Sequence, residues 1–236
     1  MSIAENVASI RREMAAAAAA CGRDPGQILL CAATKTQSAD AVRQAIAAGV
    51  DCCGENRVQE LTAKLRENAY EGAPVHFIGH LQTNKVRQVV GRVSLIQSVD
   101  SLRLLRAIDA EAARQGIVQD ILLEVNIGQE ASKSGFDPCQ ILPVVENASL
   151  FSNICIKGLM AIPPISHNPG ENLNFFQKMF QLTVDIRNKI ADNVIVDCLS
   201  MGMSGDFPDA IACGSTMIRV GTAIFGARDY AKESSK

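Results

Sequence analysis

The chain has 236 residues, a formal net charge of −2, 47% hydrophobic residues and 20% charged residues. This length suits a single domain with a sizeable core, since α/β barrels commonly run to about 250 residues. The near-balance of 23 basic and 25 acidic residues produces no general field that would attract a phosphate backbone or an anionic surface. Neither nucleic acid nor a membrane is therefore expected as a partner.

The first predicted element is an alanine-rich helix near the amino terminus. Its most apolar stretch, residues 14–21, is far shorter than the roughly 20 apolar residues needed to cross a bilayer. Charged residues at positions 5, 11, 12 and 13 precede this stretch, which is typical of an amphipathic helix and not of a secretion signal. We therefore expect a cytoplasmic protein.

After this helix, short β-rich runs alternate with stretches of helical spacing. Strands are expected at 28–34, 50–54, 75–80, 95–99, 120–126, 155–160, 194–200 and 217–225. Helices are expected at 39–48, 57–68, 84–90, 101–115, 138–147 and 172–191. Eight alternating strands predict an α/β protein with one domain over 1–236, a single (β/α)8 TIM barrel with an additional N-terminal helix. An open doubly wound sheet is disfavoured because no glycine-rich phosphate fingerprint follows the first strand.

The two remaining compositional features concern the tail and the cysteines. Residues 232–236 are expected to form a disordered tail. The eight cysteines are predicted to be reduced and mostly buried, since disulfide frameworks belong to short secreted chains. No two cysteines have the two-residue gap typical of zinc or redox motifs, and the chain has only three histidines. We therefore expect no metal site.

Polar residues follow several predicted strands, and in a barrel the carboxyl ends of the strands carry the chemistry. Lys35 ends the first strand beside an apolar run, where a low local dielectric eases loss of its proton and suits a Schiff-base lysine. A solvated lysine at a strand end is the alternative. The loops after strands seven and eight, with Ser204 in the first and Gly221 and Thr222 in the second, favour a phosphate site. Simple turns are the alternative there.

Arg219 lies within the last apolar run, so its guanidinium is expected to point into the barrel mouth. A buried arginine needs a partner, which is either a carboxylate such as Glu124 or an acceptor atom on a bound cofactor. A Schiff-base lysine, two phosphate loops and an inward arginine together predict a site for pyridoxal 5′-phosphate (PLP).

Long ordered strings along the chain are also those of a known family. They include ATKT at 33–36, GENRVQE at 54–60, HFIGHLQTNK at 76–85, LSMGMSGDF at 199–207 and RVGTAIFG at 219–226. On these strings the sequence resembles the pyridoxal phosphate homeostasis proteins nearly from end to end. The resemblance implies a barrel like the N-terminal domain of alanine racemase, with PLP as the cofactor.

The same resemblance implies roles for individual residues. Lys35 matches the lysine that holds PLP as an aldimine, and Arg219 matches the arginine that faces the pyridine nitrogen. The phosphate cup matches Ser204, Gly221 and Thr222, and the positions lining the same mouth match Asn56, Ser200 and Met203.

Two functions are open for such a site: a PLP-dependent amino-acid racemase or related enzyme, and a PLP carrier. A racemase needs a second acid/base group across the cofactor from the lysine, usually a tyrosine contributed through an additional domain. The only tyrosines, Tyr70 and Tyr230, lie before the third strand and in the tail. An arginine facing the ring nitrogen offers donors only, which weakens the cofactor as an electron sink.

The carrier is therefore the favoured function, and a lysine-dependent aldolase without the cofactor is a weaker alternative. We predict a protein that is not an enzyme, that buffers PLP and takes part in vitamin B6 homeostasis. PLP-dependent apo-enzymes are its expected recipients, and a monomer is expected in preference to a dimer.

Overall fold

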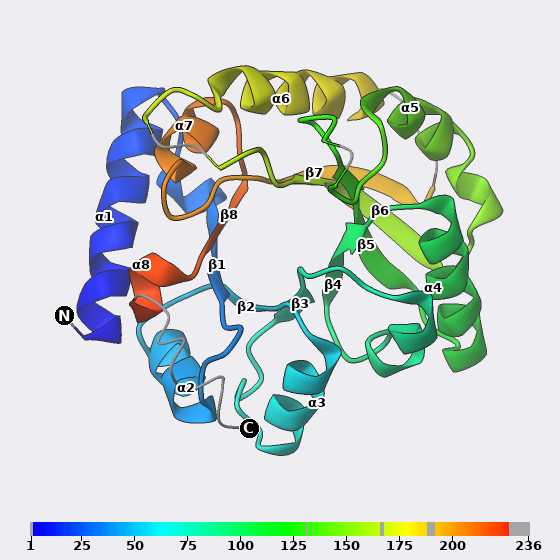
Figure 1. The fold of residues 1–236 in the computed structure, drawn as a ribbon, viewed down its shortest axis with the longest axis horizontal. Coiled ribbons are helices and arrows are strands. Elements are labelled where there is room, and N and C mark those ends of the chain that lie inside the picture. Colours follow the sequence, from blue (N-terminus) through cyan, green and yellow to red (C-terminus); the bar gives the residue numbers. More distant parts are fainter. Residues whose placement is uncertain (1, 131, 166–167, 188–191, 227–236) are drawn as a thin grey trace.

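The computed structural model of the chain describes residues 2–130, 132–165, 168–187 and 192–226. Parallel strands pair in chain order and the last pairs with the first, so the sheet closes into a barrel (Figure 1). The strands are β1 (Leu29–Ala33), β2 (Cys52–Glu55), β3 (Val75–Phe77), β4 (Leu95–Val99), β5 (Gln119–Val125), β6 (Ile154–Ala161), β7 (Val194–Ser200) and β8 (Met217–Val220). The predicted (β/α)8 barrel is confirmed.

Helices surround the barrel (Figure 1). They are α1 (Ile3–Ala20), α2 (Ala39–Ala47), α3 (Val58–Arg66), α4 (Leu102–Gln115), α5 (Pro138–Glu146), α6 (Leu173–Arg187), α7 (Phe207–Ala212) and α8 (Thr222–Phe225), with 3₁₀ helices η1 (Pro25–Gln27), η2 (Thr83–Gln88) and η3 (Ala148–Leu150). Within the described ranges, no helix combines the length and the apolarity that crossing a membrane requires.

The additional N-terminal helix is present as α1. It is capped by Ser2, whose side chain accepts a hydrogen bond from the backbone N–H of Glu5 and so satisfies one of the free donors of the first turn. Its buried residues recur at helical spacing and therefore form one apolar stripe: Val7, Ile10, Met14 and Ala18. This stripe packs against α7 and α8, on the left of Figure 1.

Two expected elements differ from those observed, and one observed helix was not expected. The expected strand 217–225 is wrong in its second half, because β8 ends at Val220 and the backbone N–H groups of Ile224 and Phe225 donate back to Gly221 O. Its apolar run is therefore shared between a strand and the short helix α8, whose Ile224 packs against α1. The expected helix 84–90 is the 3₁₀ helix η2, and α7 was not expected.

The end of one expected segment and the whole of another lie outside the described residues. These are the end of the expected helix 172–191 and the expected tail 232–236. The single domain over 1–236 remains a prediction.

The apolar core has an outer and an inner part. Leu30 and Ala32 of β1 belong to the cluster that includes α1, so they face the surrounding helices. Since side chains alternate along a strand, Cys31 between them points into the barrel. There it packs with residues from several strands, namely Cys52, Leu95, Leu122, Met160 and Met217. The barrel interior is therefore filled by side chains and is not a pore.

Gly158 allows β6 to lie close against β7, at a point where the register of the strand pair shifts. A Cβ atom at this position would collide with the carbonyl oxygen of Cys198. The residue also has a φ of +141°, a conformation that residues with a side chain rarely adopt. The close pairing of these two strands therefore requires glycine.

We expect Gly158→Ala to lower the free energy of unfolding by roughly 3 kcal/mol, since overpacking and an unfavourable φ both act against the folded state. Gly205→Ala is the control, because a Cβ at Gly205 meets nothing within 4 Å. Urea unfolding of the two proteins measures the difference. Equal stability of the two variants would contradict the packing argument.

Candidate functional site

All eight residues predicted for the site lie at the carboxyl ends of four consecutive strands of the closed barrel, β7, β8, β1 and β2. Ser200 ends β7 and is followed by Met203 and Ser204; Arg219 lies in β8 and is followed by Gly221 and Thr222; Lys35 follows β1; and Asn56 follows β2. The barrel closure between β8 and β1 thus brings the first and last parts of the chain to one side of the mouth.

The segment before Lys35 is fixed by a buried carboxylate, Glu55. Its Oε1 accepts hydrogen bonds from Thr34 Oγ1 at 2.5 Å, Lys64 Nζ at 2.7 Å and Tyr70 OH at 3.1 Å. Lys64 Nζ also donates to the carbonyl oxygen of Thr34 at 2.6 Å. Glu55 and Lys64 are both buried, so this ion pair is well shielded from water. We call Thr34, Glu55, Lys64 and Tyr70 the Glu55 cluster.

The Glu55 cluster also decides what Tyr70 does. Burial, together with the adjacent Glu55 carboxylate, raises the pKa of Tyr70. A phenol that stays protonated and donates to a structural carboxylate is a packing element and does not serve as an acid/base group at the mouth.

The residue after Lys35 has a strained backbone. Thr36 has a φ of 64°, a conformation that costs a β-branched residue on the order of 1–2 kcal/mol. Its N–H donates to Glu60 Oε2 at 2.6 Å, and its Oγ1 donates to the carbonyl oxygen of Lys35 at 2.6 Å. The Glu55 cluster before Lys35 and these bonds after it together fix the direction in which the half-buried Lys35 side chain leaves the backbone.

The loops after β7 and β8 contact each other through hydroxyl groups. Thr222 Oγ1 donates to Ser204 Oγ at 3.1 Å, and Ala223 N–H lies 3.5 Å from the same oxygen. Gly221 lies against Ala33 of β1, where a Cβ would come within 3.4 Å. These contacts place two hydroxyl donors and the backbone of both loops beside the end of β1.

A second buried carboxylate, Asp206, shapes the loop after β7. Asp206 Oδ1 accepts from the backbone N–H of Met203 at 2.7 Å, and Oδ2 accepts from Asn172 Nδ2 at 2.8 Å. Asn172 Nδ2 also donates to the carbonyl oxygen of Pro164, which ties the loop after β6 to the loop after β7. Sequence reasoning did not assign Asp206 a role, although it directly follows the Ser204–Gly205 pair.

Arg219 is buried at 5% exposure and donates to two neutral oxygens. Nη1 donates to Ser200 Oγ at 2.6 Å, and Nη2 donates to the carbonyl oxygen of Ala161 at 2.9 Å. Burial lowers the pKa of Arg219, and the charge of the nearby Glu124 carboxylate opposes this shift. The two hydrogen bonds hold the guanidinium. A guanidinium carries five N–H donors, so further donors remain for a ligand acceptor at the mouth.

Ser200 also extends the hydrogen bonding of Arg219 deeper into the barrel. Its Oγ donates to Gln97 Oε1 at 2.6 Å, and Gln97 Nε2 lies 2.9 Å from His76 Nδ1. We call Arg219, Ser200, Gln97 and His76 the interior polar chain. All four side chains are buried, and they run from the mouth into the apolar interior.

On the β4 and β5 side of the mouth, ionisable groups gather that the sequence did not assign to the site. Burial, followed by the nearby Asp100 carboxylate, raises the pKa of Glu124 to about 7, against the opposing effects of Arg219 and His80. His80 Nδ1 lies 3.1 Å from Asp100 Oδ2 and 3.3 Å from Ser134 Oγ. The mouth thus carries an amine, two hydroxyls, a guanidinium and a carboxyl group that titrates near neutrality.

Asn56 gives a test of whether this mouth fits a polar ligand. Its Oδ1 is buried without a hydrogen-bond partner, and leaving such a group unpaired costs about 1–3 kcal/mol. A ligand with a polar substituent next to β2 would remove this cost. The donors on β1, β7 and β8 suit an aldehyde and a phosphate, so the residues present fit PLP.

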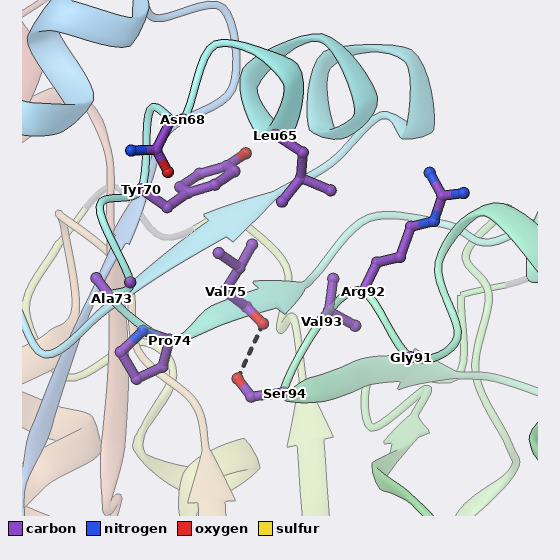
Figure 2. Close-up of a pocket in the computed structure, with 11 residues that line it drawn as sticks. Leu65, Asn68, Tyr70, Ala73, Pro74, Val75, Gly91, Arg92, Val93 and Ser94 are labelled. Atoms are coloured by element: carbon purple, nitrogen blue, oxygen red, sulfur yellow. Dashed lines mark hydrogen bonds between the residues drawn. The ribbon is translucent and has the colours of Figure 1, made fainter. Parts of the chain in front are cut away.

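A different cavity, of about 410 Å³, opens near the beginnings of β3 and β4. Figure 2 shows Tyr70, Val75 and Ser94 among its lining side chains, with Ser94 Oγ donating to the carbonyl oxygen of Val75 at 3.0 Å. None of the eight predicted site residues lines it. The candidate site is therefore the mouth at the carboxyl ends of the strands, and not this cavity.

Comparison with known proteins identifies the family to which this chain belongs. The family model described as alanine racemase, N-terminal domain, matches residues 2–229. The pyridoxal phosphate homeostasis protein of Haemophilus influenzae is 36% identical over 238 residues, covering 100% of both chains. The protein of the same name from Escherichia coli K12 is 38% identical over 234 residues, covering 98% of this chain and 99% of that one. The chain belongs to the pyridoxal phosphate homeostasis protein family.

Solved structures agree with this family. PipY of Synechococcus elongatus, with PLP bound, has a TM-score of 0.81 and 34% identity, covering 95% of this chain and 100% of that one. Alanine racemase of Clostridium difficile has a TM-score of 0.67 at 16% identity, covering 95% of this chain and 57% of that one, and this likeness shows the fold alone.

The raised pKa of Glu124 leads to a pH-dependent prediction. In the folded protein its pKa of about 7 lies above the ordinary value of 4.5, so the folded state holds an extra proton between these values. Wild-type stability therefore falls as pH rises through this window, and the contribution is lost above pH 7. Removing the carboxyl group in Glu124→Gln should make the variant more stable relative to wild type at pH 8 than at pH 5, by roughly 2–3 kcal/mol.

Urea unfolding of the cofactor-free proteins at pH 5 and pH 8 measures this difference. Glu13→Gln, at an exposed position on α1, serves as the control for replacing a glutamate by glutamine. A stability difference for Glu124→Gln that is the same at both pH values would show that folding does not raise the pKa of Glu124.

Proposed function

We propose that this protein binds PLP at the barrel mouth and takes part in PLP homeostasis as a carrier and buffer. The observation that carries the proposal is the meeting of Lys35, the two hydroxyl-bearing loops and Arg219 on the neighbouring strands β7, β8 and β1. Relatives that match the chain over its whole length bear the name pyridoxal phosphate homeostasis protein, and PipY is a relative with PLP bound.

Each predicted residue has a distinct part in this proposal. When bound, PLP supplies an aldehyde that reacts reversibly with an amine, and Lys35 is the amine that its surroundings position for this bond. Ser204, Thr222 and the backbone of Gly221 donate to the phosphate. Arg219, held by Ser200 and Ala161, keeps a donor for the pyridine nitrogen. Asn56 and Met203 line the mouth.

The chemistry of Arg219 and the hydrogen bond of Tyr70 favour a carrier over an enzyme. Arg219 offers only donors, so it favours an unprotonated pyridine ring and weakens the cofactor as an electron sink. Tyr70 donates to Glu55 within the Glu55 cluster, and Tyr230 lies outside the described residues.

One observation favours the second candidate, a weak PLP-dependent racemase. Glu124 has a pKa of about 7, which is suited to proton transfer at neutral pH.

The carrier proposal extends to recipients, compartment and oligomeric state. PLP-dependent apo-enzymes are the proposed recipients, and a cytoplasmic monomer is the proposed form. All eight cysteines are free, which suits a reducing compartment. Incubating the loaded protein with a cofactor-free PLP enzyme, and measuring recovery of that enzyme's activity, tests the transfer. Recovery no faster than from the same amount of free PLP under a competing PLP trap would contradict direct transfer.

We expect Lys35→Ala to abolish the covalent link to PLP. Borohydride reduction should fix PLP to a Lys35 peptide in wild-type protein, whereas the variant should show loss of the chromophore and no reduced adduct. Lys133→Ala is the matched control: Lys133 donates to the carbonyl oxygen of Pro163 on a loop near the mouth. It should trap PLP like wild type. Peptide mapping that finds PLP on another lysine in wild-type protein would overturn the assignment.

We also expect the PLP-loaded protein to turn over ordinary amino acids at well below the rates of about 1–1000 per second that are typical of enzymes. Both alanine enantiomers and a panel of other amino acids should be assayed for racemisation, transamination and decarboxylation. Robust turnover that disappears in Glu124→Gln would establish the racemase-like alternative, with Glu124 as its acid/base group.

A further inference from the structure

Three metal-ligating side chains meet inside the barrel, below the mouth. Cys31, Cys52 and His76 come from β1, β2 and β3, and their ligand atoms all lie within 4.8 Å of one another. Cys31 is directly paired with Cys52 in the sheet. All three are buried, with exposures of 0%, 2% and 6%. We call them the Cys–Cys–His cluster.

The backbone around the cluster leaves room for these side chains. His76 is paired with Gly54, which lies two residues after Cys52 and therefore on the same face of β2. A Cβ at Gly54 would come within 3.0 Å of Cys31 Sγ, so this glycine clears the space that the sulfur occupies. The cluster therefore results from the register of three strands and not from spacing along the chain.

The separation of the ligand atoms suits a tetrahedral ion. Zinc–sulfur bonds of about 2.3 Å and zinc–nitrogen bonds of about 2.0 Å place sulfur and nitrogen ligands about 3.6 Å apart. The distance from Cys52 Sγ to His76 Nδ1 is 3.5 Å. The other pairs of ligand atoms lie no more than 4.8 Å apart. Small side-chain rotations would bring them to a separation suited to a tetrahedral ion.

We propose that Cys31, Cys52 and His76 form a binding site for a thiophilic divalent cation, of which Zn²⁺ is the example. Binding breaks two S–H bonds, forms two S–Zn bonds and one N–Zn bond, and releases two protons to solvent. Two thiolates and one divalent ion sum to zero charge. A neutral complex is what a buried site next to Arg219 tolerates, since an uncompensated charge there would be costly.

Two neighbouring features bear on this site. Gln97 Nε2 donates to His76 Nδ1 at 2.9 Å and to Met217 Sδ at 3.1 Å. A cation bound at Nδ1 would replace the first of these hydrogen bonds, because both use the same nitrogen lone pair, and would leave Gln97 its contact with Met217. A cavity of about 510 Å³ at the opposite end of the barrel from the mouth is lined by His76, Asp120, Asp197 and Lys157, so one member of the cluster borders a cavity. Lys157 Nζ pairs with Asp197 Oδ2 at 2.9 Å.

The site is distinct from the PLP mouth, and the proposal does not depend on PLP binding. Three protein ligands leave a fourth coordination position for water or for another donor. Cys53, although adjacent to Cys52 and fully buried, is on the other face of β2 and outside the cluster.

The test uses the full-length protein carrying Cys21→Ser and Cys139→Ser, because these two cysteines are exposed and would bind metal adventitiously. After removal of metal with a chelator under a non-thiol reductant, Zn²⁺ is titrated against a chromophoric chelator, and Co²⁺ is used as a spectroscopic probe. We expect one equivalent per chain, release of about two protons, a thiolate-to-cobalt absorption band and a higher Tm with Zn²⁺.

Cys52→Ala should weaken Zn²⁺ binding at least about 100-fold and remove the stabilisation by Zn²⁺. Mutating even a neighbour of a metal ligand typically lowers metal affinity 10- to 100-fold. Cys53→Ala is the matched control and should bind as the parent does. If Cys52→Ala does not fold, Cys31→Ala is measured in its place. Absence of the thiolate band in the parent protein, or equal affinity in the two alanine variants, would mean an adventitious ion only and would overturn the proposal.

Discussion

The carboxylate of Glu55 is the constraint on which the lysine side of the mouth depends. It accepts from a residue after β1, from α3 and from the connection before β3, so one oxygen joins three successive parts of the chain. Removing a partner of a buried charge costs about 3–5 kcal/mol, because the remaining charge is left uncompensated. The position of Lys35 is therefore coupled to packing in the outer layer, through α3 and the connection before β3.

The interior of this barrel is not filled by apolar side chains alone. Apolar side chains occupy much of it, but the interior polar chain leads from Arg219 through Ser200 and Gln97 to His76. Each link satisfies a group that would otherwise be buried without a partner. The chain places the proposed cofactor mouth and the Cys–Cys–His cluster at two ends of one hydrogen-bonded line.

Much of the fold and mouth could be predicted from sequence, and the remainder depended on tertiary pairing. Alternating runs predicted the strands, and the residues after them predicted Lys35 and Ser204. The run 217–225 was misassigned because apolar composition alone does not distinguish a strand from the short helix α8 that packs on α1. The Glu55 cluster and the Cys–Cys–His cluster escaped prediction because each joins residues from separate elements, and strand register decides which of them meet.

The proposed site is assembled from the two ends of the chain, with Lys35 and Asn56 near the start and Ser200 to Thr222 near the finish. During synthesis, a ribosome-bound chain that has not yet exposed β8 would have the lysine but neither the arginine nor the second phosphate loop. A ligand that contacts both sides binds only the closed barrel and so stabilises the contact between β1 and β8, which joins residues distant in sequence. Bound PLP would then connect the two parts of the chain where β1 pairs with β8 to close the barrel. Its binding would mark the completion of folding.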